Sequence, residues 1–115
     1  ILSKAYPSGM NIDDELIDIL YEPSQRKNSA EAFRGFINLF NDYLATDLFK
    51  SVNCDIHLIW GEKDPWESIE EAKEWKNNFS NIKSLDILEG IGHCPHDESP
   101  KETNKILLKL IQDTK

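Results

Sequence analysis

Residues 56–66 read Ile-His-Leu-Ile-Trp-Gly-Glu-Lys-Asp-Pro-Trp, a short apolar run that ends in a glycine and a polar loop. A run of this length, bounded by glycine and rich in residues that favour strands, is typical of a largely buried β-strand. A second run, Ser84–Leu88, is closed by Gly90 and Gly92. Between the two, Ser68 opens a Ser-x-x-Glu capping box followed by apolar residues at helical spacing, which predicts a helix.

The segment after the second strand carries a strong helix start. Ser99 stands at the cap position, Pro100 at the first helical position and Glu102 at the third. We expect the buried face of this helix to consist of Ile106, Leu107, Leu110 and Ile111. Strand, helix, strand, helix predicts parallel pairing with a right-handed crossover. Because two parallel strands are a poor independent sheet, we expect an α/β fold whose sheet is incomplete in these residues.

Residues 1–50 contain no strand-like run of useful length and are predicted to be helical. Asn11 is the predicted cap of a first helix, and Glu22-Pro23 should end it. A second helix is predicted after Asn28, with Glu31 in a capping box. Its apolar positions follow at steps of three and four residues: Phe33, Phe36, Ile37 and Phe40.

The composition of the 115 residues, 39% hydrophobic and 30% charged, suits a soluble globular protein. A net charge of −8 argues against binding to nucleic acid, because attraction to phosphate backbones needs clustered lysine and arginine. No apolar run reaches the roughly 20 residues of a membrane span, and no leader opens the sequence. A start at Ile1 rather than Met fits a processed or truncated chain.

The two cysteines, Cys54 and Cys94, are too few for a disulfide framework. We expect two free thiols in a reducing compartment, either the cytoplasm or a plastid-like organelle.

Two polar side chains that could carry chemistry each follow a predicted strand. Asp64 comes after the first strand, and His93 lies in the glycine-containing loop after the second. Because adjacent parallel strands end at the same edge of a sheet, we expect these side chains to lie close together. The histidine could act as a general base and the aspartate could orient it. Taken singly, each has a simpler interpretation, an exposed loop histidine and a turn aspartate.

Two other interpretations of the histidine segment are weaker. A metal site would have to use His93, Cys94, His96, Asp97 and Glu98, but near-consecutive residues do not easily converge on one tetrahedral centre. We therefore predict no metal and no cofactor. Cys94 as a nucleophile beside His93 is disfavoured, since sequence neighbours rarely face each other. Asp97 and Glu98 are explained by their place before a helix start, where negative charge is favourable.

These two segments carry a family resemblance. Ile56–Trp66 resembles the acid loop, and Gly90–Pro100 (Gly-Ile-Gly-His-Cys-Pro-His-Asp-Glu-Ser-Pro) resembles the histidine loop, of α/β-hydrolases in the branch of epoxide hydrolases and haloalkane dehalogenases. The second segment is similar to that of plastid and cyanobacterial pheophytinase-like members. The resemblance implies that residues 1–50 are a helical cap segment and that residues 51–115 are the C-terminal part of the hydrolase core. It also implies that Asp64 is the acid and His93 the base.

The resemblance implies a hydrolase whose nucleophile and oxyanion hole lie before Ile1, in roughly 100–200 further residues. No Gly-x-Ser-x-Gly nucleophile turn occurs in residues 1–115. The favoured activity is serine-type cleavage of a lipophilic ester, and the expected partners are that small substrate and the remainder of the hydrolase domain. The substrate pocket is expected to be lined by Phe33, Phe36, Phe40 and Trp66.

Three alternatives remain open from the sequence. An aspartate nucleophile would imply cleavage of epoxides or haloalkanes. A scaffold without catalytic residues would imply ligand binding or protein interaction. A third alternative is a small α/β domain that folds on its own.

Overall fold

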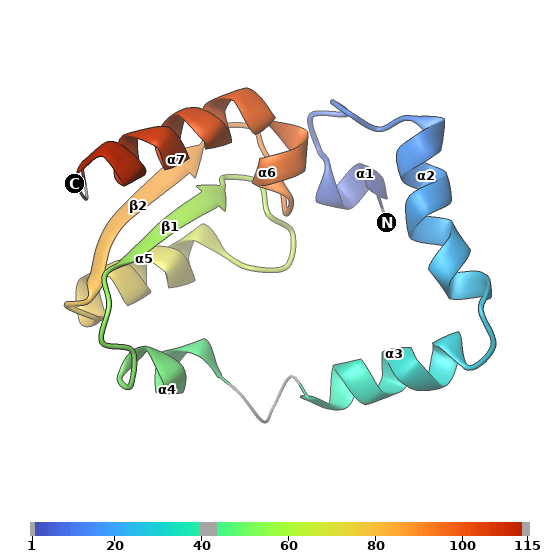
Figure 1. Ribbon diagram of the computed structural model, residues 1–115, viewed down its shortest axis with the longest axis horizontal. Helices are drawn as coiled ribbons and strands as arrows, with labels where there is room; N and C mark the ends of the chain where they lie inside the picture. Colours follow the sequence, from blue (N-terminus) through green and yellow to red (C-terminus); the bar gives the residue numbers. More distant parts are fainter. Residues whose placement is uncertain (1, 40–43, 114–115) are drawn as a thin grey trace. The chain divides into compact units, whose positions relative to one another are not determined.

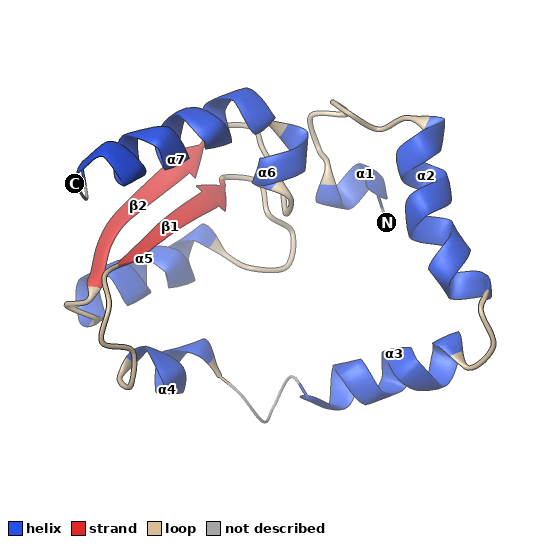
Figure 2. Cartoon of the chain, viewed as in Figure 1, coloured by secondary structure: helices blue, strands red, loops and turns tan. Residues whose placement is uncertain are grey.

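The computed structural model describes residues 2–39 and 44–113, and the structural statements that follow concern these residues (Figure 1). The elements, in chain order, are α1 (Leu2–Ala5), α2 (Asp14–Tyr21), the 3₁₀ helix η1 (Glu22–Gln25), α3 (Ser29–Asn38), α4 (Ala45–Phe49), β1 (Ile56–Gly61), α5 (Ile69–Asn78), β2 (Ile82–Leu88), α6 (Pro95–Glu98) and α7 (Pro100–Asp113). The fold class is mixed α/β with a sheet of two strands in the described part of the chain, as the sequence predicts (Figure 2).

The chain divides into two compact units. The α/β unit comprises Ile1–Asn11 and Cys54–Lys115, and the helical unit comprises Ile12–Asn53. This division differs from a boundary at residue 50, because the first residues of the chain pack with the α/β unit. The buried Tyr6 donates its hydroxyl hydrogen to Asp97 Oδ2 at 2.7 Å. Whether the helical unit acts as a cap stays a prediction.

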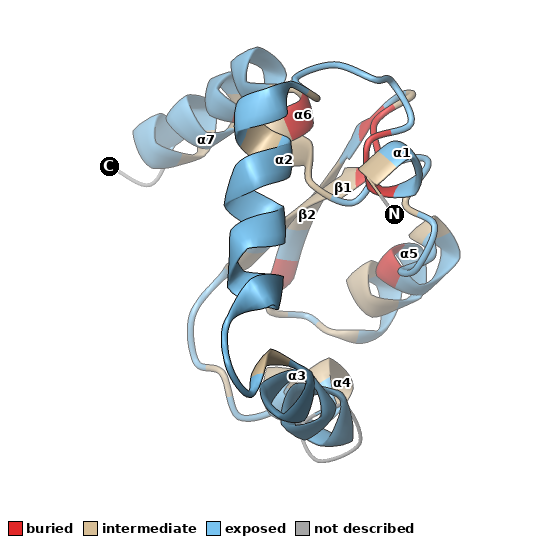
Figure 3. Ribbon diagram, turned by 90° about the vertical axis from the view of Figure 1, so that its right-hand side faces the viewer, coloured by how far each residue is buried: buried red, intermediate tan, exposed pale blue. Residues whose placement is uncertain are grey.

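The two strands of the α/β unit pair in parallel, which confirms the predicted pairing. Their register runs from Ile56 opposite Ile82 to Gly61 opposite Leu88, with one irregularity after Ile56. Helices α5 and α7 lie on opposite sides of this sheet (Figures 1 and 3). The strands therefore end together, and the loops that follow them meet at one edge.

The predicted start of α5 is confirmed. Ser68 caps it, because its hydroxyl oxygen accepts the N–H of Glu71 at 3.2 Å. Helix α7 begins at Pro100, as predicted. One element was not expected: α6, a single turn that begins at Pro95. Proline suits the first helical position, but four residues are too few to show a helical period in the sequence.

Many buried residues of the α/β unit lie near the carboxyl ends of the strands, whereas Ile82 begins β2 and Ala72 lies in α5 (Figure 3). The buried apolar residues are Ala5, Tyr6, Ala72, Ile82, Leu88 and Ile91, and the buried polar ones are Glu98 and Thr103. The predicted buried face of α7 is wrong for Leu107 and Ile111, which are 43% and 58% exposed. Two strands offer too little surface to cover a helix of 14 residues.

The helical unit begins with α2, whose cap is Asp13 rather than the predicted Asn11. Asp13 Oδ1 accepts the N–H of Leu16 at 2.8 Å. Asn11 instead has a left-handed backbone with φ of 60°, and its side chain donates to the carbonyl of Asp97 in the α/β unit. A helix-cap residue normally has an extended backbone conformation, which the left-handed Asn11 does not have.

The ends of the other helices in this unit follow the sequence more closely. Helix α2 ends at Tyr21, before Glu22-Pro23, and α3 begins after Asn28, as predicted. The Asn28 side chain makes no cap hydrogen bond, because its backbone is left-handed with φ of 67°. Phe33 and Phe36 have ring centroids 6.4 Å apart and are 64% and 58% exposed. Phe40 lies outside the described residues.

Two predictions about the whole chain can be compared with these residues. None of the described helices has the length and apolar character that a membrane crossing requires. Cys54 and Cys94 are both free thiols, the first exposed and the second half-buried, as predicted.

Candidate acid–base site

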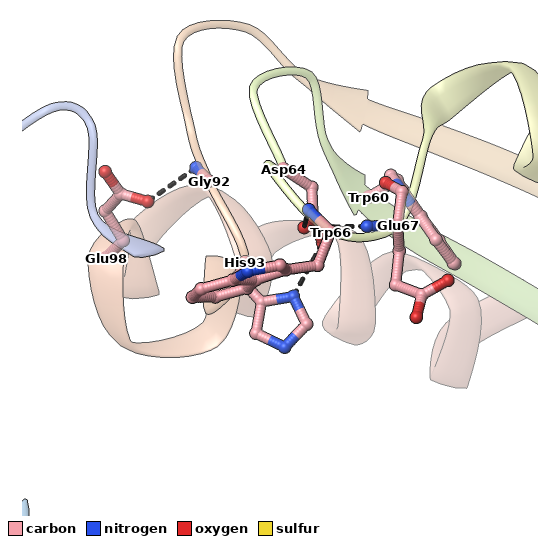
Figure 4. A network of polar contacts seen from close by, with 7 residues as sticks. All are labelled: Trp60, Asp64, Trp66, Glu67, Gly92, His93 and Glu98. Carbon is pink, nitrogen blue, oxygen red and sulfur yellow. Dashed lines mark hydrogen bonds and ion pairs between the residues drawn. The ribbon is translucent and has the colours of Figure 1, made fainter. Parts of the chain in front are cut away.

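Asp64 lies in the loop that joins β1 to α5, and this loop orients its carboxylate. Asp64 Oδ1 accepts the backbone N–H groups of Trp66 at 3.0 Å and Glu67 at 3.1 Å (Figure 4). The Asp64 N–H donates to the carbonyl of Gly61 at 3.3 Å. This is the tight aspartate turn that Asp-Pro predicts. One carboxylate oxygen is thereby held by the loop, and the other is directed toward the loop that follows β2.

His93 meets that second oxygen. Its Nδ1 lies 2.8 Å from Asp64 Oδ2, so the proximity expected for two neighbouring parallel strands is observed. The Asp64 side chain is 7% exposed and that of His93 is 41% exposed. An ionised carboxylate only accepts hydrogen bonds, so this contact assigns the proton to Nδ1 of the neutral ring. Nε2, on the far side of the ring, points away from Asp64 (Figure 4).

The environment of Asp64 favours its ionised form. Burial acts to raise the pKa of Asp64, but hydrogen bonds from Trp66 N–H, the His93 ring and Glu67 N–H outweigh it, and the pKa is lowered. A carboxylate that is charged at neutral pH can stabilise a positive charge on the adjacent imidazole.

Tryptophan side chains brace the acid loop. The Trp66 ring lies edge-on to the His93 ring, with centroids 4.8 Å apart and an interplanar angle of 87° (Figure 4). Trp60 Nε1 donates to the carbonyl of Glu67 at 3.1 Å, and its ring packs edge-on to Trp75 at 5.6 Å. Trp60 therefore packs against α5 through its ring and also ties the loop to β1 through its indole N–H.

Hydrogen bonds join the acid loop to the histidine loop directly. Lys63 N–H donates to the carbonyl of Ile91 at 2.8 Å, and Gly90 N–H donates to Glu62 Oε2 at 2.9 Å. One backbone–backbone and one backbone–side-chain hydrogen bond thus hold the two loops together, independently of the contact between Asp64 and His93.

Two glycines allow the backbones to approach this closely. A Cβ atom on Gly61 would lie 1.9 Å from the carbonyl oxygen of Gly92. A Cβ on Gly92 would lie 2.3 Å from both the Ala5 carbonyl oxygen and Pro7 Cδ. These distances are far below van der Waals contact, so the packing at the edge of the sheet requires both residues to lack a side chain.

The side chains of the alternative metal site contact different partners rather than one another. His93 faces Asp64, Asp97 accepts the Tyr6 hydroxyl, and Glu98 accepts the N–H of Gly92. Among the described residues, no set of three or more histidine, cysteine, aspartate or glutamate side chains could hold a metal ion. Burial and the hydrogen bond to Asp97 raise the pKa of Tyr6, so its phenol stays protonated.

The proposed pocket residues are distributed over both units. Trp66 packs against His93 in the α/β unit, whereas Phe33 and Phe36 belong to the helical unit. A pocket formed by them stays a prediction.

Glu98 is the residue that the sequence argument missed. It was interpreted as a favourable charge before a helix, but its side chain is completely buried. The sequence contains only a weak signal of this role. An acidic residue stands near Gly92, and the backbone N–H of a buried glycine needs a hydrogen-bond acceptor.

An imidazole with one nitrogen held by a carboxylate and the other free to face a reactant can accept and return a proton. Comparisons with known proteins are in keeping with such chemistry. No protein-family model matches the chain, and no solved structure matches it. It is 28% identical, over 116 aligned residues, to pheophytinase, chloroplastic, of Arabidopsis thaliana. The alignment covers 97% of this chain and 24% of that protein, so the chain spans about a quarter of the length of this curated relative. This partial similarity supports a relationship to hydrolases.

Proposed function

We propose that this chain supplies the acid and the base of a serine-type hydrolase that cleaves lipophilic esters. Asp64 is the acid, His93 is the base, and the nucleophilic serine lies outside residues 1–115. The observation that carries the proposal is the 2.8 Å contact between His93 Nδ1 and Asp64 Oδ2, with Nε2 pointing away from Asp64. The similarity to a protein named as a pheophytinase is its second support.

The mechanism follows from the orientation of the imidazole. Nε2 takes the proton of the serine hydroxyl as its oxygen attacks the ester carbonyl, and the ring becomes an imidazolium. Asp64 keeps the proton on Nδ1 and stabilises this positive charge. Nε2 then gives the proton to the departing alkoxide, which leaves an acyl-enzyme. Water, activated by the same nitrogen, hydrolyses the acyl-enzyme and restores the serine.

A lipophilic substrate is supported by exposed aromatic side chains. Trp66 is 51% exposed beside His93, and Phe33 and Phe36 are exposed on α3 of the helical unit. Large aromatic side chains line most pockets that bind apolar small molecules.

His93→Ala tests the proposal in the full-length protein that contains this chain. Turnover of a p-nitrophenyl ester should fall by several orders of magnitude, because the general base is lost. His57→Gln is the matched control, since His57 is exposed on β1 and its ring contacts the Ser84 hydroxyl rather than Asp64. Nearly full ester turnover by the His93→Ala protein would contradict the proposal.

A fluorophosphonate probe, which labels activated serines, identifies the nucleophile. We expect labelling of the full-length protein that disappears in His93→Ala and persists in His57→Gln. Epoxide or haloalkane turnover without labelling would indicate an aspartate nucleophile instead. Neither labelling nor turnover would favour a ligand-binding scaffold.

A further inference from the structure

Glu98 is a fully buried ionisable side chain to which the mechanism above gives no role. Glu98, the last residue of α6, has no exposed surface. A buried carboxylate is costly unless it is paired or hydrogen-bonded. The hydrogen-bond partners of Glu98 therefore indicate its role.

Glu98 bridges two segments of the chain, the histidine loop at Gly92 and the N-terminal segment at Ser8. Its Oε2 accepts the backbone N–H of Gly92 at 2.6 Å. Its Oε1 accepts the backbone N–H of Ser8 at 2.8 Å and the Ser8 hydroxyl. Because its two oxygens accept from N–H groups of both segments, this carboxyl group acts as a clamp on both backbones.

The clamped N–H group belongs to Gly92, the residue just before the proposed base His93. Gly92 directly precedes His93, and His93 N–H donates to the carbonyl of Ala5 at 2.8 Å. Two successive N–H groups of the loop are thus held, that of Gly92 by Glu98 and that of His93 by Ala5. Figure 4 shows the arrangement: Glu98 reaches the backbone at Gly92, whereas Asp64 reaches the imidazole ring.

We infer that Glu98 is a positioning residue, which fixes the backbone of the histidine loop so that the imidazole stays in register with Asp64 and with its reactant; this inference rests on the proposed function. Glu98 does not touch the ring, and its carboxylate accepts hydrogen bonds from two backbone N–H groups and a hydroxyl. It therefore acts through the placement of His93 and transfers no proton itself.

Glu98→Gln is the direct test, in the full-length protein with a p-nitrophenyl ester. Glutamine keeps the size of the side chain but replaces one acceptor oxygen with an NH₂ group. Whichever way the amide turns, that NH₂ faces a backbone N–H, of Gly92 or of Ser8, and one donor loses its acceptor. The loop should shift, and kcat per titrated active site should fall about 10- to 100-fold, with KM within about twofold.

Glu102→Gln is the matched control. Glu102 is exposed on α7, so the same chemical change there should leave kcat and KM unaltered. Glu98→Gln with wild-type kcat per active site would overturn the inference. So would a variant that lowers only the number of titratable active sites, since that result means a role in stability alone.

Ser8→Ala provides a second, milder variant. It removes the hydroxyl and leaves both backbone hydrogen bonds, so kcat should fall a few-fold with KM unchanged, and its effect should not add fully to that of Glu98→Gln. If Glu98→Gln does not fold, Ser8→Ala decides, and an unchanged kcat overturns the inference. His93→Ala, measured in parallel, separates the two proposals. If His93→Ala loses activity while Glu98→Gln keeps normal turnover, only the positioning role of Glu98 is contradicted. If His93→Ala keeps normal activity, both proposals are contradicted.

Discussion

His93 Nδ1 and Asp64 Oδ2 lie 2.8 Å apart, although 29 residues separate them in the chain. The parallel strands β1 and β2 bring their following loops to one edge of the sheet, and backbone hydrogen bonds hold these loops together. The other carboxylate oxygen of Asp64, Oδ1, accepts the N–H groups of Trp66 and Glu67. The loop that carries Asp64 therefore orients its carboxylate toward the His93 ring.

Asp64→Asn should lower kcat for ester hydrolysis by about 10³- to 10⁴-fold. The asparagine carbonyl oxygen is expected to take the place of Oδ1, because two backbone N–H groups require an acceptor there. The NH₂ group then faces His93 and favours the proton on Nε2, so the ring cannot accept one. Steady-state kinetics of the full-length protein measure the effect.

The control for that variant is Asp55→Asn. Asp55 forms an exposed ion pair with Lys83 at 3.6 Å, which should contribute little to stability or activity. A loss in Asp64→Asn no larger than in Asp55→Asn would contradict the assigned role of Asp64.

Asp64 should also make stability depend on pH at acidic values. Its pKa is lower in the folded than in the unfolded chain, so its ionisation stabilises the fold above the ordinary aspartate range. This contribution is lost as pH falls through the folded-state pKa. The free energy of unfolding in urea should therefore be lower for Asp64→Asn than for wild type at roughly pH 6. This difference in free energy should be smaller at roughly pH 2.5. A difference that stays constant between the two would disprove this linkage.

Local patterns in the sequence were sufficient for much of the α/β unit. The capping box at Ser68 and the Ser99-Pro100 start identify the first turns of α5 and α7, because caps depend on residues only a few positions away. The proximity of Asp64 and His93 followed from the rule that parallel strands end at one edge. These inferences required no knowledge of side-chain packing.

Burial and long-range contacts could not be predicted in the same way. The role of Glu98 depends on Ser8, 90 residues away, and no periodicity relates the two. Both Asn11 and Asp13 are residue types that cap helices, and the left-handed backbone of Asn11 decided between them. The exposed Leu107 and Ile111 show that an amphipathic pattern predicts which face of a helix is apolar but not whether that face is covered.

Gly92→Ala should destabilise the protein by about 1–3 kcal/mol and displace the histidine loop. The new Cβ would meet the Ala5 carbonyl and the Pro7 ring at 2.3 Å, and neither can move without shifting the backbone. Urea unfolding measures the free energy, and kcat should fall with it because His93 is the next residue. Gly35→Ala is the opposite case: nothing lies within 4 Å of its Cβ position in α3, so alanine should stabilise the helix by about 0.5–1 kcal/mol. If the Gly92→Ala protein were as stable and as active as the Gly35→Ala protein, residues 2–11 could not be packed against the histidine loop as described.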